Sequence, residues 1–153
     1  MAGEVLQPKS DFLLDTGIII RYLRGKRQAA DLLDFLDQLG EVHVSVITYL
    51  EILINVQPRE EESTRLFFER VSPLVVNQEV AQKAASLIKK HPAAFGKEVG
   101  RGTPDALIAA TAWQGQAVFV TLNTRHFAKV PIAEITIQAI EQDAEDWTSL
   151  LKT

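Results

Sequence analysis

The stretch Arg101-Gly-Thr-Pro-Asp-Ala-Leu-Ile-Ala-Ala-Thr-Ala-Trp113 predicts a helix with an acidic residue in its first turn. Thr103 suits the N-cap, and Pro104 suits the first helical position, where a missing N–H costs nothing. The residues after Asp105 are almost all apolar, so we expect this helix to be buried on most sides. An Asp in a first turn also complements the helix dipole. Taken alone, Asp105 therefore fits a structural role as well as a functional one.

The composition is that of one ordinary globular domain. The 153 residues are 46% hydrophobic and 24% charged, which suffices for a sizeable core, and we expect a single domain over residues 1–153. The sequence has no Cys, which excludes disulfides, thiolate metal sites and cysteine nucleophiles, and suits a cytoplasmic location. No segment approaches the ~20 apolar residues that cross a bilayer, and the N-terminus lacks a signal-peptide pattern. We expect neither membrane insertion nor secretion.

The net charge of −4 argues against a protein that coats nucleic acid, because such a protein would be basic overall. It does not exclude a nuclease, since an enzyme that gathers metal ions needs only a local cluster of carboxylates. An acidic balance also suits a basic protein partner.

Predicted strands and helices alternate along the chain. The apolar run Phe12-Leu13-Leu14 predicts a buried strand, followed by a turn that carries Asp15 and by a short helix. Further strands are predicted at 42–46, 74–76, 117–120 and about 132–137, and further helices at 28–39, at 49–54 with Thr48 as a possible cap, and at 59–71, 78–91 and 139–151. Residues 91–102, rich in Gly, predict a loop. The alternation favours an α/β fold, a three-layer α/β/α sandwich with a mainly parallel central sheet, whose core covers about residues 11–137.

Four polar residues are predicted to meet at one edge of this sheet, because the functional crevice of such folds lies at the carboxyl ends of the strands. Asp15 follows the first strand and Asn123 follows the strand at 117–120, while Glu51 and Asp105 lie on helices that can reach the same edge. Glu51 is isolated in an apolar helix, where a carboxylate is costly unless it pairs with an Arg, accepts hydrogen bonds or binds a cation. Oxygen ligands of this kind suit Mg²⁺ or Mn²⁺, which activate water for phosphodiester cleavage.

Four motifs in this order resemble the PIN-domain ribonucleases, and in particular the VapC-type toxins of bacterial and archaeal toxin–antitoxin pairs. They are Phe12-Leu-Leu-Asp-Thr-Gly-Ile18, Ser45-Val-Ile-Thr-Tyr-Leu-Glu-Ile52, Pro104-Asp-Ala-Leu-Ile-Ala-Ala-Thr-Ala112 and Val120-Thr-Leu-Asn-Thr-Arg-His-Phe127. The resemblance implies a PIN-like fold and a metal-dependent endoribonuclease that hydrolyses RNA. It also implies a homodimer and a cognate antitoxin that often inserts a basic residue into the acidic pocket.

The resemblance further implies roles for individual residues. Asp15, Glu51 and Asp105 match the acidic positions of the family and would hold one or two ions of Mg²⁺ or Mn²⁺. Asn123 stands where the family carries Asn or a fourth Asp, and would act as a supporting ligand or would position water. His126 stands where many members carry Asp or Glu, so this site has fewer carboxylates.

Neighbouring residues are expected to support this site. Thr16 and Thr121 are expected to hydrogen-bond the carboxylates. Among the basic residues that flank the predicted edge, Arg101 and Arg125 are the preferred candidates for RNA phosphates, which long basic side chains contact without reading sequence.

Two other interpretations remain open. One is a catalytically weak PIN-like module that binds RNA or protein, which the departure at His126 favours. The other is a receiver-like phosphoacceptor domain that uses Asp15, but such a domain has paired acids before its first-strand Asp and a Lys after a late strand, and this sequence shows neither.

Overall fold

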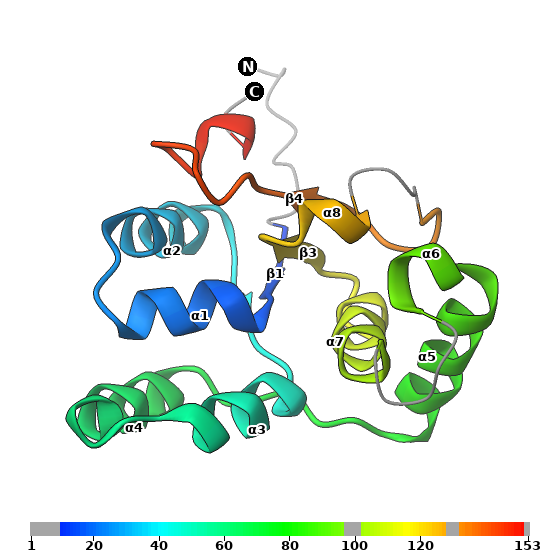
Figure 1. The fold of residues 1–153 in the computed structure, drawn as a ribbon, viewed down its shortest axis with the longest axis horizontal. Coiled ribbons are helices and arrows are strands. Elements are labelled where there is room, and N and C mark those ends of the chain that lie inside the picture. Colours follow the sequence, from blue (N-terminus) through cyan, green and yellow to red (C-terminus); the bar gives the residue numbers. More distant parts are fainter. Residues whose placement is uncertain (1–9, 97–101, 128–131, 152–153) are drawn as a thin grey trace, which may run out of the picture.

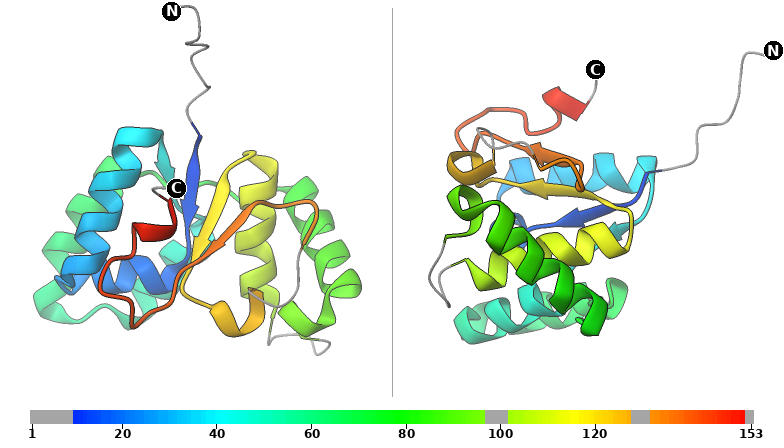
Figure 2. Two further views of the ribbon diagram at one scale, coloured as in Figure 1. Left: turned by 90° about the horizontal axis from the view of Figure 1, so that it is seen from above. Right: turned by 90° about the vertical axis from the view of Figure 1, so that its right-hand side faces the viewer.

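The computed structural model describes residues 10–96, 102–127 and 132–151, which form three layers (Figure 1). The middle layer is a four-stranded sheet in the order β2-β1-β3-β4, and every neighbouring pair is parallel. Its strands are β1 (Phe12–Leu14), β2 (Val42–His43), β3 (Val118–Thr121) and β4 (Ile137–Ala139). Helices cover both faces of the sheet (Figure 2). The predicted α/β/α sandwich with a parallel sheet is therefore confirmed.

Helices make up most of the remaining described chain. The α-helices are α1 (Thr16–Leu23), α2 (Arg27–Leu39), α3 (Val46–Asn55), α4 (Glu61–Arg70), α5 (Gln78–Lys90), α6 (Pro92–Phe95), α7 (Thr103–Gln114) and α8 (Thr124–Phe127), and 3-10 turns lie at Pro58–Glu60 and Ser149–Leu151. Within the described ranges, no helix has the length and apolar character to cross a membrane.

The two faces of the sheet are covered by different helices. Successive strand residues point to opposite faces, and accordingly Leu13 and Phe119 pack with buried residues of α5 and α7. Phe12 and Leu14 pack on the other side with α1, α2 and the C-terminal Trp147. The sheet is thus buried on both faces, as parallel sheets generally are.

Helix α7 is buried on most sides, as predicted. Its buried residues are Ala106, Ile108, Ala109, Ala110, Thr111 and Ala112. The helix begins one residue earlier than predicted, because its N-cap is Gly102 and not Thr103. A Cβ atom at position 102 would lie 1.3 Å from the Phe95 carbonyl oxygen. Glycine therefore permits the close approach of α6 to the start of α7.

The predicted strand at 74–76 is wrong. Leu74 forms only an isolated bridge with Ser45, and the side chain of Val75 is exposed. Strand β2 is likewise shorter than predicted, because α3 begins at Val46. The Ser45 hydroxyl caps α3 by accepting the Ile47 N–H at 3.1 Å, so the cap is not Thr48.

The predicted C-terminal helix at 139–151 is also wrong. Residue 139 ends β4, and the chain then turns until the 3-10 turn at Ser149–Leu151. Asp146 Oδ1 accepts hydrogen bonds from the Thr148 N–H and hydroxyl at 2.8 and 2.6 Å. Such local side-chain bonds compete with helix formation. Trp147 is buried, and its indole N–H donates to the Gln142 carbonyl at 3.2 Å, which holds the turned conformation.

Two further predictions are partly wrong. The edge strand expected at 132–137 begins only at Ile137, because Ile132 and Ile135 turn into the core beside α5 and α7. The loop expected at 91–102 contains α6, which Pro92 opens at its first turn; residues 97–101 lie outside the described part.

Candidate active site

Three carboxylates from distant parts of the sequence approach one another at the carboxyl edge of the sheet. Asp15 directly follows β1 and caps α1, Glu51 lies in the middle of α3, and Asp105 lies in the first turn of α7. Their electrostatic coupling shows the proximity, since the charges of Asp15 and Glu51 both act on Asp105. The structure thus brings together the three acids that the sequence analysis selected.

Asp15 is held at both of its carboxylate oxygens. Oδ1 accepts the Thr16 backbone N–H at 2.8 Å, and Oδ2 accepts the Thr121 hydroxyl at 2.7 Å. The Asp15 N–H donates to the Val120 carbonyl at 2.9 Å, which ties the end of β1 to β3. Asp15 therefore has a fixed position, and its orientation depends on two strands.

Glu51 is oriented by two threonine hydroxyls in series. The Thr16 hydroxyl donates to Glu51 Oε1 at 2.6 Å, and the Thr48 hydroxyl lies 3.0 Å from the same Thr16 oxygen. Because Thr16 has a single hydroxyl proton and donates it to Glu51, Thr48 must donate to Thr16. The predicted hydrogen bonds of Thr16 and Thr121 are confirmed. Thr48 was missed as part of this network, although it lies one helical turn before Glu51 and hence on the same face of α3.

The protonation of these acids reflects burial and mutual repulsion. Burial raises the pKa of Asp105 to about 6, with the charges of Asp15 and Glu51 adding to the increase. Burial also raises the pKa of Asp15; the hydrogen bonds from Thr121 and Thr16 oppose this rise, while the Glu51 charge adds to it. A nearby positive charge would reverse both shifts, because it favours the charged form of a carboxylate.

The three carboxylates have no cationic partner of their own within residues 10–96, 102–127 and 132–151. The ion pairs in these ranges all involve other acids. The Arg partner considered for Glu51 is therefore not found in the described chain. The guanidinium of the nearby Arg21 donates to the Gly17 carbonyl at 3.0 Å instead.

Asn123 connects this carboxylate cluster to His126. Its backbone N–H donates to the Thr121 hydroxyl oxygen at 3.0 Å, and that hydroxyl in turn donates to Asp15. The side-chain nitrogen of Asn123 lies 3.1 Å from His126 Nδ1. Arg125 is exposed on α8 beside them. Arg101 lies outside the described residues.

A cavity of about 380 Å³ opens beside Asp105. It is bounded by α6, by Gly102 at the start of α7 and by His126 on α8. The site therefore combines a cluster of oxygen ligands with an adjoining hollow.

The sequence matches the family model described as "PIN domain" over residues 12–133. This chain belongs to the PIN-domain family. A relative, Ribonuclease VapC19 of Mycobacterium tuberculosis, is 33% identical over 120 residues, which cover 78% of this chain and 94% of the relative.

Solved structures share the fold of this PIN domain. A chain of VapBC2 from Rickettsia felis, bound to a promoter DNA fragment, has a TM-score of 0.70 and 18% identity, covering 86% of this chain and 99% of that one. A chain of VapBC-1 from nontypeable Haemophilus influenzae has a TM-score of 0.62 and 26% identity, covering 90% of this chain and 98% of that one.

A second group of possible metal ligands lies near the amino ends of β1 and β2 of the PIN domain. They are Asp11, Glu41 and His43. Each residue offers one ligand atom, and these three atoms lie within 4.8 Å of one another. His43 Nε2 is 3.7 Å from Asp11 Oδ2 and 3.6 Å from Glu41 Oε2. Asp15 lies at the other end of β1, four extended residues or ~13 Å away. This second group therefore lies at the opposite end of β1 from the carboxylate cluster.

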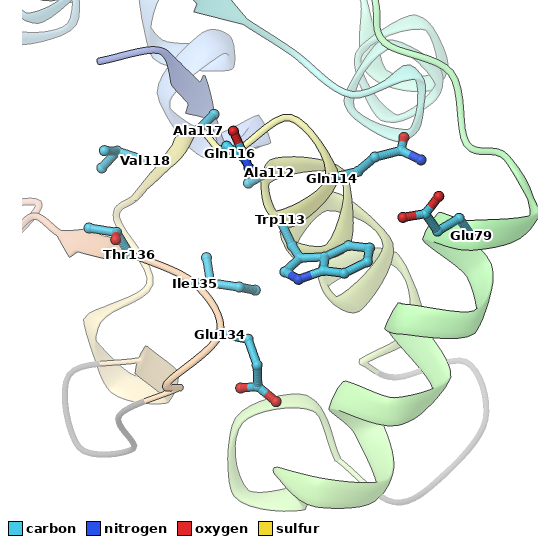
Figure 3. A pocket seen from close by; sticks show the side chains of 10 residues that line it. All are labelled: Glu79, Ala112, Trp113, Gln114, Gln116, Ala117, Val118, Glu134, Ile135 and Thr136. Atoms are coloured by element: carbon cyan, nitrogen blue, oxygen red, sulfur yellow. The ribbon is translucent and has the colours of Figure 1, made fainter. Parts of the chain in front are cut away.

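Another cavity, of about 470 Å³, lies at the far end of α7 and is lined by Trp113, Gln114 and Glu134, among others (Figure 3). It is remote from Asp105, because Gln114 ends α7 whereas Asp105 is in its first turn. Glu134 already has cationic partners, since Lys83 Nζ lies 3.7 Å from its carboxylate. This cavity therefore differs in charge and place from the carboxylate cluster.

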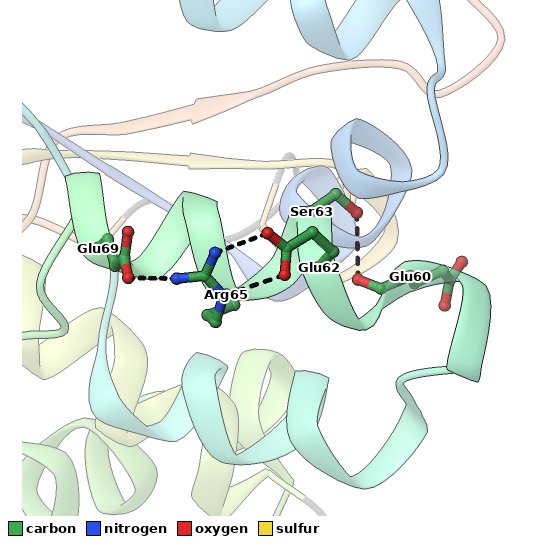
Figure 4. Close-up of polar contacts among 5 residues, drawn as sticks. All are labelled: Glu60, Glu62, Ser63, Arg65 and Glu69. Atoms are coloured by element: carbon green, nitrogen blue, oxygen red, sulfur yellow. Dashed lines mark hydrogen bonds and ion pairs between the residues drawn. The ribbon is translucent and has the colours of Figure 1, made fainter.

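Some basic residues of the PIN domain are already paired. On α4 the Arg65 guanidinium lies between Glu62 and Glu69 and donates to both carboxylates (Figure 4). The Arg24 Nε donates to the buried Glu60 at 3.2 Å. Arg125, by contrast, is exposed on α8.

Proposed function

We propose that this protein is a divalent-metal-dependent endoribonuclease and the toxin of a toxin–antitoxin pair. The observation that carries the proposal is the cluster of Asp15, Glu51 and Asp105, which have no cation of their own within the described chain. The family and the similarity to Ribonuclease VapC19 support the same activity.

The residues present fit a hard divalent cation such as Mg²⁺ or Mn²⁺. The three side chains offer only oxygen ligands, which these ions prefer. The raised pKa values of Asp15 and Asp105 support this assignment, because a bound cation would favour the charged carboxylates that burial disfavours. When bound, such an ion polarises a water molecule and neutralises charge on the phosphodiester.

The chain itself supplies orientation and charge. The Thr16 and Thr121 hydroxyls fix Glu51 and Asp15, so that two carboxylates hold their positions before substrate arrives. Asp105 contributes a third carboxylate from the rigid start of a buried helix. We assign Asn123 as a supporting ligand or as the group that positions the attacking water, because its backbone is tied to Thr121.

The negative charge of the carboxylate cluster also indicates which protein partner would bind there. An uncompensated carboxylate cluster would accept an Arg or Lys side chain, and this supports an antitoxin that blocks the site with a basic residue. The matched structures include a toxin–antitoxin complex and a member of a family of toxin–antitoxin systems, which supports such a partner here. The proposal includes a homodimer, a cytoplasmic location, and phosphate contacts by Arg125 and Arg101.

The test is cleavage of a mixed tRNA and rRNA pool by purified protein with Mg²⁺ or Mn²⁺, beside an EDTA control. Asp15→Asn should abolish cleavage, because it removes a negative ligand while preserving the shape of the side chain. Asp34→Asn is the matched control, since Asp34 is exposed on α2. Circular dichroism confirms that both variants fold. No cleavage by folded wild-type protein with either metal would refute the proposal and favour a binding module.

A further inference from the structure

The cavity beside Asp105 is the starting point for a proposal about substrate specificity. Its volume of about 380 Å³ falls within the range of about 300–1,000 Å³ that small-molecule sites occupy. Asp105 stands at one side of it and His126 at another, so whatever enters the cavity lies next to the carboxylate cluster.

The described walls of this cavity are mainly apolar. They are formed mainly by α6, through Pro92, Ala93, Ala94 and Phe95. Apart from Asp105 and His126, the side chains of the described lining carry no titratable group. The Phe95 ring packs in the core, edge-on against the Phe127 ring, with the two ring centroids 5.5 Å apart.

His126 is the hydrogen-bonding group of this lining other than a carboxylate. The Asn123 side-chain nitrogen has only protons to offer, so in this arrangement it donates to His126 Nδ1. The ring proton then sits on Nε2. Asn123 therefore fixes His126 as an N–H donor, and His126 is one of the residues that line the cavity.

We infer that this cavity binds a nucleobase of the RNA next to the cleaved phosphate, with the His126 Nε2–H donating to an acceptor on the edge of that base. The inference rests on the proposed nuclease function and adds a specificity-determining residue to it. Proteins read single-stranded RNA in this way, by enclosing unstacked bases and hydrogen-bonding to their edges.

Binding by the metal-free protein tests the cavity without relying on cleavage. Nuclear magnetic resonance titrations would compare the four nucleoside 5′-monophosphates with ribose 5-phosphate, which lacks the base. We expect at least one nucleotide to shift the signals of Ala93, Ala94 and His126, and ribose 5-phosphate to leave them in place. Shifts that are absent, or equal with ribose 5-phosphate, would overturn the inference.

A matched pair of variants locates the binding. Ala93→Leu should abolish the nucleotide-dependent shifts, because Ala93 lines the cavity and is exposed enough to accept a larger side chain. Ala85→Leu places the same side chain at an exposed position of α5 and should leave the shifts intact. Equal shifts in both variants would place the nucleotide elsewhere.

Cleavage of short RNAs that differ only at the nucleotides beside the cut tests the role of His126. His126→Phe keeps a ring but removes the donor, and should lower kcat/KM for the preferred base by about tenfold while sparing the poorest substrate. His126→Gln, which restores an N–H, should recover part of that preference. If wild-type protein cleaves RNA with a base preference that neither variant changes, the role of His126 is refuted. The proposed nuclease function is then still supported. If wild-type protein cleaves nothing, the proposed function fails, and the titrations still decide whether the cavity binds a base.

Discussion

The Thr121 hydroxyl donates to Asp15 Oδ2 at 2.7 Å, although 106 positions separate the two residues in the sequence. The same Thr121 oxygen accepts the Asn123 backbone N–H at 3.0 Å. One buried hydroxyl thus joins the ends of β1 and β3 and sets the positions of two proposed site residues.

Thr121→Val should weaken both the fold and the proposed metal site. The substitution preserves shape but leaves an Asp15 oxygen without its donor, which costs about 1–3 kcal/mol of unfolding free energy. Loss of a hydrogen bond to a metal ligand typically lowers metal affinity about 10–100-fold. Calorimetric titration with Mn²⁺ and urea unfolding measure the two effects. Thr121→Ser keeps the hydroxyl and should restore both; a Ser variant as impaired as the Val variant would contradict the hydrogen-bond explanation.

The Thr48–Thr16–Glu51 series should behave as one unit. Thr16→Val removes the donor to Glu51 and should reduce Mn²⁺-dependent cleavage more than Thr48→Val, which removes only the second hydrogen bond. In the double variant, the loss of Thr48 should add little to the loss of Thr16, because both act through the same carboxylate. Strictly additive effects on the logarithm of kcat/KM would show that the hydroxyls act independently.

Metal-free protein should lose stability as the pH rises through the pKa of Asp105. The folded protein keeps the Asp105 proton up to a pH of about 6, whereas the unfolded chain releases it near the ordinary pKa of an aspartate, 3.8. The folded state therefore binds more protons between these values, and the stabilisation, complete at lower pH, is lost as the pH rises through about 6. Asp15 adds to the effect with the same sign, since its pKa is also raised.

The measurement is a thermal melt in EDTA at a pH of about 5 and of about 7.5 for wild type and Asp105→Asn. Titrating groups that do not interact with Asp105 are common to both proteins and cancel in the comparison. Between the lower and the higher pH, the melting temperature of wild type should fall further than that of the variant. Added Mg²⁺ should reverse this extra fall. Equal changes in the two proteins would show that Asp105 does not carry the raised pKa.

Gly102→Ala should displace the start of α7. The added Cβ would overlap the Phe95 carbonyl oxygen at 1.3 Å, so α6 and α7 would have to separate. Because Asp105 lies in that first turn, cleavage should fall together with the melting temperature. Gly115→Ala at the other end of α7 is the control, since its Cβ would meet its nearest neighbour, the Thr111 carbonyl, at an ordinary 3.6 Å. Equal tolerance at both positions would contradict the close packing of α6 on α7.

Sequence patterns predicted the elements with strong periodicity or clear boundaries. The strand before Asp15, the amphipathic helix α2 and the buried helix α7 all appear, and Thr16 and Thr121 form the expected hydrogen bonds. Whether Asp15, Glu51, Asp105 and Asn123 bind metal or catalyse remains a prediction.

The wrong predictions share a physical cause. In each case, contacts with residues distant in the sequence determined the local structure. The acid-rich C-terminal segment has helical composition, but burial of Trp147 and the hydrogen bonds of Asp146 hold it in turns. Gly102 replaces Thr103 as the cap because α6 lies against it, and no local signal reveals α6 as its neighbour. Thr48 was read as a cap from its hydroxyl alone, whereas its partner Thr16 comes from 32 positions away.

The order of the strands has a consequence for how this protein is made. Strand β1 lies between β2 and β3, and β3 is synthesised after both of them, from residue 118 onward. A nascent chain still lacking β3 has Asp15, Glu51 and Asp105 already translated, but not the Thr121 hydroxyl that fixes Asp15 or the strand that β1 pairs with. The carboxylate cluster can therefore take the arrangement of the folded protein only after β3 has been translated.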